Sequence, residues 1–401
     1  MPDPRIPEDG APRPDPGVHA ANPSDHGPAG LQRSVSEYGG RPLRPGDPRL
    51  GGGISAPGGD DGSARSILGG GQRAPGSRSA DGGSVGTDRR LCNPQAPGFD
   101  VDLAPGGYAW WYLDAFSDDG RYGLTVIAFV GSVFSPYYAW DGWRAPHNHC
   151  ALNVCLYRLD GGASAWAMTE RTGAAVSRSR EAFAIGPSLV EWRGDTLRIA
   201  FHERTAPIPE RITGEILIEP KAFSQEHFVL DDQARHVWAP IAPRARVSFH
   251  GLRPDVTWSG EGYLDSNIGQ EPLEHGFEEW SWSRAHAAED TVLFYDATCR
   301  SGATHQTALR VLPSGDMQPI EPAPKHQLPK GFWGVGRTAR SDDPPRLVKT
   351  LEDAPFYLRT ALQGAIGDQS AAIMHESLSL DRLRSPLVKA MLPFRMPRRF
   401  W

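Results

Sequence analysis

The sequence predicts an all-β fold made of two consecutive domains of antiparallel strands. Short runs rich in Val, Ile, Tyr, Trp and Phe recur from residue 107 onward, and Gly, Asp and Pro separate them. Helical periodicity is scarce, and the best helical pattern, "SLDRLRSPLVKAML" near the C-terminus, is interrupted by Pro386. About 300 residues of mainly antiparallel strand exceed a usual single barrel or sandwich, which favours two β domains.

The first 90 of the 401 residues differ in composition from the rest. They contain 13 of the 37 prolines and 20 of the 45 glycines, but only one aromatic residue, Tyr38. Such a segment cannot bury enough apolar surface to offset the entropy of ordering, so we expect residues 1–91 to form a disordered tail. The tail lacks the apolar centre of a secretory signal and carries more acids than a transit peptide should.

The expected strands follow in chain order after the tail. "GLTVIAFVGSVFS" and "CALNVCLYRLDGG" end in turn signals, and "LVEWRGDTLRIAFHE" has the alternation of a hairpin closed at "RGD". Further strands are expected in "ITGEILIEP", "ARVSFHG", "TVLFYDATCR" and "TALRVLPSG". Strand character lapses across residues 220–235. We therefore expect an N-terminal β domain at 92–230 and a C-terminal β domain at 231–401.

Composition and motifs argue against several classes of protein. A formal net charge of −6 disfavours a general nucleic-acid binder. The longest strongly apolar run, Leu124 to Phe134, is shorter than the roughly 18 to 20 residues that cross a bilayer. Four cysteines without a secretory signal indicate reduced thiols in a cytoplasmic protein. "GVGRTA" mimics a dinucleotide fingerprint but lacks the flanking strand and helix.

Two strand-like segments carry the strongest candidate for catalysis. In "RHVWAP", His236 and Trp238 are two residues apart, as are Tyr263 and Asp265 in "GEGYLDSN", so each pair shares one face of a strand. In an apolar cavity, burial would keep Asp265 protonated near neutral pH and make it a general acid. Trp238 could stabilise a cation with its ring, and Tyr263 and His236 could orient the acid or a water. The structural alternative is that Asp265 opens a turn while Tyr263 and Trp238 are ordinary core residues.

The segment "FEEWSWSRA" alternates so that Glu278, Trp280, Trp282 and Arg284 share a face. We expect Trp280, Trp282 and Glu278 to contact the substrate, with Glu278 able to pair with Arg284 or to tune the acid. The alternative is an amphipathic strand with a solvated ion pair.

A third polar segment, "APHNHCALNVCLY", places His147, His149, Asn153 and Cys155 on one face. Zinc sites draw further ligands at recognisable spacings, and none is present, so we predict no metal. His149 and Asn153 are instead expected to support a pocket wall through hydrogen bonds.

The C-terminal segment "SPLVKAMLPFRMPRRFW" mixes large apolar side chains with basic ones. That mixture suits a membrane surface that carries anionic lipid, and it equally suits a tail that docks on its own domain.

Nine segments in chain order have a familiar character: "GYAWWYLDAFSDDG", "VFSPYY", "HNHCALNVCLY", "WAMTER", "HVWAPIAPRARV", "WSGEGYLDSNIG", "FEEWSWSRA", "LEDAPFYLR" and "MLPFRMPRR". Together they resemble the hydroxyneurosporene synthase family, the carotenoid 1,2-hydratases of phototrophic bacteria. The resemblance covers residues 92–401 and implies two lipocalin-like β domains.

The resemblance implies that the protein adds water to the terminal C1=C2 bond of acyclic carotenoids such as neurosporene and lycopene, without a cofactor. It also implies catalytic roles for His236, Trp238, Tyr263 and Asp265. We expect Asp265 to protonate C2 and Trp238 to stabilise the tertiary cation at C1, with Tyr263 able to assist it. His236 is expected to accept the proton of the attacking water. A lipid-dissolved polyene implies peripheral contact with the cytoplasmic face of a membrane.

Two other functions fit the same residues. A lipocalin-like carrier would bind a carotenoid without changing it, and an isomerase or cyclase would give a product of unchanged mass. The preferred carotenoid and the oligomeric state stay open at this point.

Overall fold

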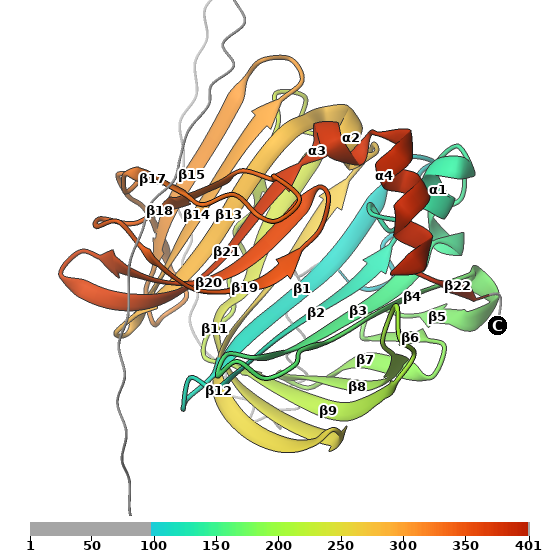
Figure 1. Ribbon diagram of the computed structural model, residues 1–401, viewed down its shortest axis with the longest axis horizontal. Coiled ribbons are helices and arrows are strands. Elements are labelled where there is room, and N and C mark those ends of the chain that lie inside the picture. The colour runs from blue at the N-terminus through green and yellow to red at the C-terminus, as the bar shows by residue number, and fades with distance from the viewer. Residues whose placement is uncertain (1–97, 400–401) are drawn as a thin grey trace, which may run out of the picture. The chain divides into compact units, whose positions relative to one another are not determined.

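The computed structural model describes residues 98–399, and these form an all-β fold (Figure 1). The predicted all-β class is therefore confirmed. The disorder expected for residues 1–91 lies outside the described residues.

Within residues 98–399, the first sheet has thirteen strands, in the order β22-β4-β3-β2-β1-β12-β11-β9-β8-β7-β6-β5, with β10 paired to β11. Every pairing in it is antiparallel except that of β22 with β4. Its strands are β1 (Tyr108–Ser117), β2 (Tyr122–Val130), β3 (Cys150–Arg158), β4 (Ala165–Arg171), β5 (Val176–Arg178), β6 (Ala182–Ile185), β7 (Ser188–Arg193), β8 (Thr196–Arg204), β9 (Arg211–Pro220), β10 (Phe228–Val229), β11 (His236–Arg253), β12 (Asp255–Gly269) and β22 (Arg398–Arg399).

In the described part of the chain the second sheet has seven strands, in the order β16-β15-β14-β13-β21-β20-β19, and a separate pair, β17-β18, accompanies it. These strands are β13 (Phe277–Ala287), β14 (Asp290–Cys299), β15 (Thr304–Val311), β16 (Met317–Pro319), β17 (Lys325–Leu328), β18 (Arg337–Arg340), β19 (Arg346–Asp353), β20 (Tyr357–Ile366) and β21 (Gln369–Ser379). The short helices are α1 (Pro136–Trp140), η1 (Pro146–Asn148), η2 (Gly173–Ala175), α2 (Leu273–Gly276), α3 (Leu380–Leu383), α4 (Pro386–Met391) and η3 (Leu392–Phe394).

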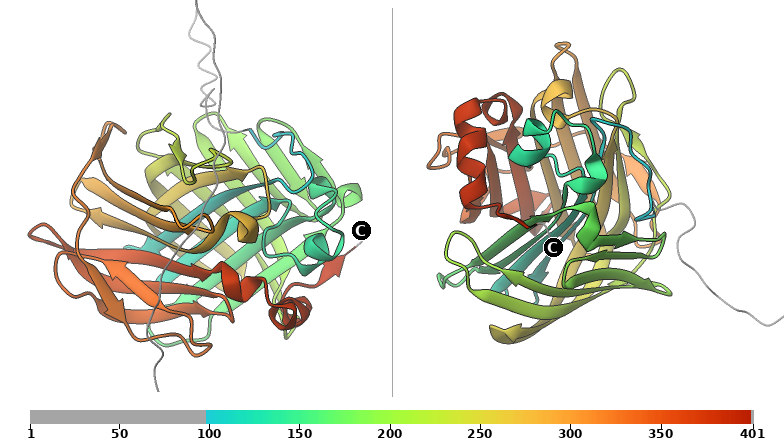
Figure 2. Two further views of the ribbon diagram at one scale, coloured as in Figure 1. Left: turned by 90° about the horizontal axis from the view of Figure 1, so that it is seen from above. Right: turned by 90° about the vertical axis from the view of Figure 1, so that its right-hand side faces the viewer.

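Strand β1 lies at the centre of the fold and is buried on both faces. Its even-numbered residues Tyr108, Trp110 and Tyr112 join an aromatic core with side chains of the second sheet. Its odd-numbered residues, Trp111 among them, pack in a separate core against the curled β6–β9 part of the first sheet. Because successive side chains of a strand point to opposite faces, β1 separates two cores. Figure 2 shows the curled first sheet beside the second sheet, which is coloured from orange to red. The face that carries the even-numbered residues looks towards the second sheet.

Two local predictions from the sequence are confirmed. The segment around "RGD" forms the β7–β8 hairpin, with Gly194 at a φ of 63° in its turn. The C-terminal helical pattern forms two helices, α3 and α4, because Pro386 cannot continue α3 but starts α4.

The position of the expected domain boundary stays a prediction. Strands β11 and β12 follow the expected seam at 220–235, but they pair within the first sheet. The chain changes to the second sheet between Gly269 and Phe277. Within residues 98–399, no helix is both long and apolar enough to cross a membrane.

Candidate active site

Asp265 lies near the C-terminal end of β12, on the face that looks towards the second sheet. Its side chain is 4% exposed. Trp238 Nε1 and the Tyr263 hydroxyl each donate a hydrogen bond to Asp265 Oδ2, both at 2.8 Å. Oδ1 has no hydrogen-bond partner among the described residues. Hydrogen bonds therefore hold the carboxyl group through Oδ2, while Oδ1 makes none with the described residues.

The strand register explains why these three side chains meet. Tyr263 and Asp265 are two residues apart on β12, so they share a face as the sequence predicted. Strand β11 runs antiparallel beside β12 and pairs Pro240 with Asp265, which brings Trp238 alongside. Trp238 and Tyr263 are fully buried. The predicted grouping of Trp238, Tyr263 and Asp265 is confirmed by this geometry.

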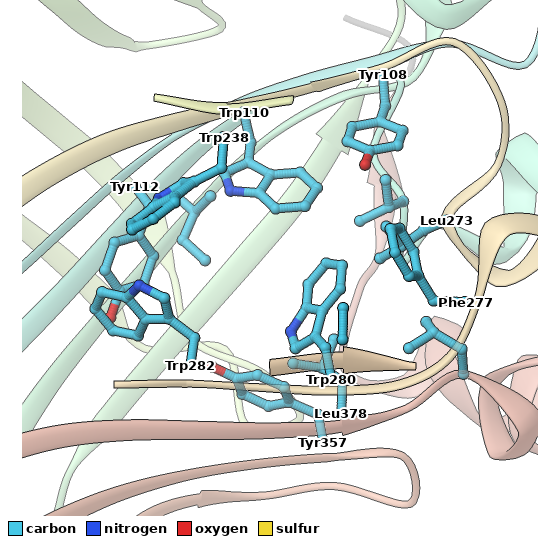
Figure 3. Close-up of a cluster of buried hydrophobic side chains, with 14 of the residues drawn as sticks. Tyr108, Trp110, Tyr112, Trp238, Leu273, Phe277, Trp280, Trp282, Tyr357 and Leu378 are labelled. Atoms are coloured by element: carbon cyan, nitrogen blue, oxygen red, sulfur yellow. The ribbon is translucent and has the colours of Figure 1, made fainter. Parts of the chain in front are cut away.

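A cavity of about 30 Å³ lies beside Asp265, which is enough space for one water molecule. Figure 3 shows tryptophans of the two sheets facing each other here, with Trp110 and Trp238 on one side and Trp280 and Trp282 on the other. Trp238 does not border the cavity, and its ring packs on Phe228 and Tyr295. The wall consists of Trp110, Tyr112, Asp265, Asn267, Trp280, Trp282, Tyr295 and Glu376.

Burial raises the pKa of Asp265 from 3.8 to about 8. The hydrogen bonds from Trp238 and Tyr263 favour the carboxylate and oppose this shift, while the charges of Glu376 and Asp114 add to it. Below pH 8 the protonated acid therefore predominates. A carboxylic acid that keeps its proton at neutral pH beside an aromatic cavity can act as a general acid.

Glu278 does not line this cavity, so the predicted common face with Trp280 and Trp282 is wrong for that residue. The pairing of β13 with β14 shifts between Phe277 and Glu279, which inserts one extra residue and leaves Glu278 exposed. Trp280 and Trp282 point into the cavity as predicted.

The expected pair of Glu278 with Arg284 is also wrong. Arg284 Nε donates to Asp114 Oδ1 at 2.8 Å, and its Nη2 bonds the same oxygen. Asp114 and Arg284 are 0% and 1% exposed, so the ion pair joins β1 of the first sheet to β13 of the second in the protein interior.

His236 belongs to a separate hydrogen-bond network. Its Nδ1 lies 2.8 Å from the Tyr108 hydroxyl and its Nε2 lies 3.3 Å from Glu271 Oε1. Burial lowers the pKa of His236, which favours the neutral imidazole. The residue pairs with Gly269, four residues beyond Asp265 on β12 and therefore about 13 Å along the strand. The structure does not bring His236 to Asp265.

His149 and Asn153 lie at two further places. His149 Nδ1 is 2.8 Å from Glu170 Oε1 and 2.6 Å from Arg398 Nη1, so it holds β22 against β4. Asn153 donates to the carbonyl of Ala167 at 2.9 Å and lines a second cavity. Neither residue borders the cavity beside Asp265.

The second cavity, of about 50 Å³, has a mainly apolar wall. The C-terminal segment, which we define as residues 386–399, covers one side of it with Leu392, Arg395 and Met396. Arg395 lies over the ring of Trp166 at 4.2 Å. Leu387 and Phe394 of the same segment are 72% and 77% exposed. The segment thus docks on its own chain while presenting apolar side chains outward.

The sequence did not point to Arg359 and Glu376, which connect the two cavities. Glu376 lines the cavity beside Asp265, and Arg359 lines the second one. Arg359 Nε donates to Glu376 Oε1 at 2.8 Å, and its Nη1 donates to the Tyr157 hydroxyl at 2.8 Å and to Glu352 at 3.2 Å. Arg359 is 1% exposed. Arg359 ends the segment "LEDAPFYLR", to which the sequence assigned no separate role, and no short motif marks Glu376; the packing of the strands brings the two side chains together.

Comparisons with known proteins agree with the resemblance noted in the sequence. The family model of the carotenoid hydratase CrtC matches residues 126–401. An acyclic carotenoid 1,2-hydratase of Thiocapsa roseopersicina is 46% identical over 391 residues, which cover 94% of this chain and 96% of that protein. One of Rubrivivax gelatinosus is 44% identical, covering 92% of this chain and 93% of that protein. A solved structure titled a putative AttH, from Nitrosomonas europaea, has a TM-score of 0.50 at 15% identity and covers 74% of this chain and 98% of that one. That likeness shows the fold alone.

Proposed function

Since the chain belongs to the carotenoid hydratase CrtC family and is a hydratase of acyclic carotenoids, we propose that Asp265 starts the reaction by protonating the terminal C1=C2 bond. Neurosporene and lycopene are the proposed substrates, and 1-hydroxy-1,2-dihydro carotenoids are the products. The observation that carries this mechanism is a buried carboxyl group in the wall of an aromatic cavity, where burial raises its pKa to about 8.

The hydrogen bonds decide which oxygen of Asp265 carries the proton. Oδ2 accepts from both Trp238 and Tyr263, so the proton of the neutral acid resides on Oδ1, which has no partner among residues 98–399. Asp265 borders the cavity, so we propose that this proton is the one delivered to the alkene. Once the proton is transferred, the same two donors stabilise the carboxylate, since hydrogen bonds to charged groups are the stronger ones. These two hydrogen bonds therefore partly offset the cost of forming a buried carboxylate when the proton leaves.

Protonation at C2 leaves a tertiary cation at C1, which the cavity wall can stabilise. Trp110, Trp280 and Trp282 offer π faces, and an aromatic face attracts a cation by about 0.5 to 2 kcal/mol. The new carboxylate of Asp265 adds an attractive charge. Trp238, which the sequence suggested for this task, instead uses its N–H to hold Asp265. A carbon with two methyl groups is larger than a water molecule, so substrate entry requires these rings to shift.

We assign His236 a positioning role in place of proton transfer to Asp265. It bonds the hydroxyl of Tyr108, whose ring stacks on Trp110 at 5.0 Å between centroids. Trp110 in turn borders the cavity. Loss of the imidazole would release Tyr108 and allow the Trp110 ring to move.

The substrate is dissolved in lipid, and the C-terminal segment suggests how the protein reaches it. The segment presents Leu387 and Phe394 to solvent. Two basic residues, Lys389 and Arg395, lie next to them in the sequence. The same segment forms part of the wall of the apolar second cavity. We propose that this segment binds the cytoplasmic face of the membrane peripherally. The polyene next to the reacting end would occupy the second cavity, with Asn153 in its wall.

One incubation tests the proposed function. Purified protein mixed with lycopene in detergent should form a product heavier by one water, and Asp265→Asn should form none. A carrier would bind lycopene unchanged, and an isomerase or cyclase would give a product of unchanged mass. Full hydratase activity in Asp265→Asn would contradict the assignment of the acid.

A further inference from the structure

Two carboxyl groups from different sheets face the cavity in which the alkene is expected to react. Asp265 reaches it from β12 of the first sheet, and Glu376 reaches it from β21 of the second. Glu376 pairs in register with Trp282, whose ring packs on Tyr263 with centroids 5.2 Å apart. The substrate would therefore lie between the acid and a second carboxyl group.

The ion pair with Arg359 fixes Glu376 in place. Arg359 is almost fully buried and stays charged at any pH that the protein tolerates, and its Nε donates to Glu376 Oε1 at 2.8 Å. Further bonds from Arg359 to Tyr157 and Glu352 immobilise the guanidinium group. A carboxylate anchored by one oxygen has its other oxygen available to accept a proton.

Unpaired donors of the same cavity complete a place for a water molecule. Asn267 Nδ2 and Trp282 Nε1 are buried and have no hydrogen-bond partner among the described residues. The two side chains are 3% and 5% exposed, and both border the cavity together with Glu376. A water molecule can accept hydrogen bonds from these donors and donate one to Glu376.

We propose that Glu376 is the base that accepts the proton of the attacking water, an inference that rests on the proposed function. The π electrons of C1=C2 form the new bond to the Asp265 proton, which leaves a cation at C1 and a carboxylate at Asp265. A lone pair of the water oxygen then bonds C1. The electrons of one O–H bond return to that oxygen as its proton passes to Glu376. Proton transfer from Glu376 to Asp265 through water restores the starting state.

The test separates protonation of the alkene from capture of the cation. Hydration of lycopene and uptake of deuterium at C2 of recovered lycopene are measured in D₂O. Asp265→Asn should abolish both. Glu376→Gln should slow hydration by about 100-fold or more, in the range of general-base effects, while deuterium uptake continues because the cation still forms and loses a proton again.

Glu203→Gln is the matched control. Glu203 is also a buried carboxylate bonded to an arginine, Arg171 at 2.8 Å, but it does not border either cavity. It should keep a hydration rate close to that of the wild type, and thermal unfolding shows whether each variant is folded. Glu376→Asp retains the charge on a shorter side chain and replaces Glu376→Gln if the latter does not fold.

Two results would overturn the role of Glu376. One is wild-type hydration in folded Glu376→Gln. The other is loss of deuterium uptake together with hydration, since that would place Glu376 in the protonation step. A wild-type protein that forms no hydrated product would contradict the proposed function itself.

Discussion

The hydrogen bond from Tyr263 to Asp265 gives the mechanism a quantitative test. In Tyr263→Phe the ring remains and one of the two donors to Oδ2 is lost. This donor stabilises the carboxylate more than the neutral acid, so its removal should raise the pKa of Asp265 above about 8. The proton then leaves Asp265 less readily, and catalysis should slow.

The size of the effect follows from the energy of the bond. A hydrogen bond to a charged group contributes about 1.5 to 3 kcal/mol, and the neutral acid retains part of it. We therefore expect the Tyr263 hydrogen bond to stabilise the carboxylate of Asp265 by about 1.4 kcal/mol more than the neutral acid. That corresponds to about one pKa unit, or about tenfold in rate.

The assay is the pH dependence of lycopene hydration. Activity requires the proton on Asp265, so the wild-type rate should fall as the pH rises through about 8. In Tyr263→Phe this fall should move about one unit higher, and the rate at neutral pH should drop about tenfold. Tyr138→Phe is the control, because this buried hydroxyl bonds the Gly107 carbonyl away from the cavity. An unchanged pH profile in Tyr263→Phe would show that the Tyr263 hydrogen bond does not tune the pKa of the group that controls activity.

Three further changes probe other parts of the account. Trp282→Leu removes a ring from the cavity wall and should lower the turnover rate about three- to thirtyfold, with little change in lycopene binding. Steady-state kinetics measures the turnover rate, and the absorption of bound lycopene measures binding. An unchanged turnover rate would argue against stabilisation of the cation by this ring. Asp114→Asn leaves Arg284 buried without its charged partner. The free energy of unfolding, measured by urea titration, should fall by about 3 to 5 kcal/mol. A loss below about 1 kcal/mol would show that the ion pair contributes little to stability. Leu387→Asp with Phe394→Asp should reduce co-sedimentation with anionic vesicles while leaving hydration in detergent intact, and unchanged sedimentation would contradict the membrane role.

Alternation along single strands was enough to predict which candidate side chains share a face of a strand, whereas their catalytic roles were implied by the family resemblance. Tyr263 and Asp265 share a face of β12, and Trp238 joins them from the neighbouring strand. Such i, i+2 relations depend only on strand geometry, so they are visible in the sequence. The same rule failed for Glu278, because the irregular pairing beside it adds one residue and reverses the face.

The sequence could not show which side chains become neighbours through long-range packing of strands and sheets. Asp265 and Glu376 lie on different sheets and meet only where those sheets pack together. His236 shares a strand face with Trp238 but pairs with Gly269, beyond the reach of the acid. A residue's face can be predicted locally, whereas its neighbours across a sheet or between sheets depend on register and topology.

The protonation state of Asp265 is the most direct test of the account. Infrared difference spectra of wild type and Asp265→Asn isolate the carbonyl stretch of this one carboxyl group. If Asp265 keeps its proton at neutral pH, the spectra should show a carboxylic-acid band at pH 7 that disappears as the pH rises through about 8. A carboxylate band at pH 7, with titration near the ordinary value for aspartate, would contradict it.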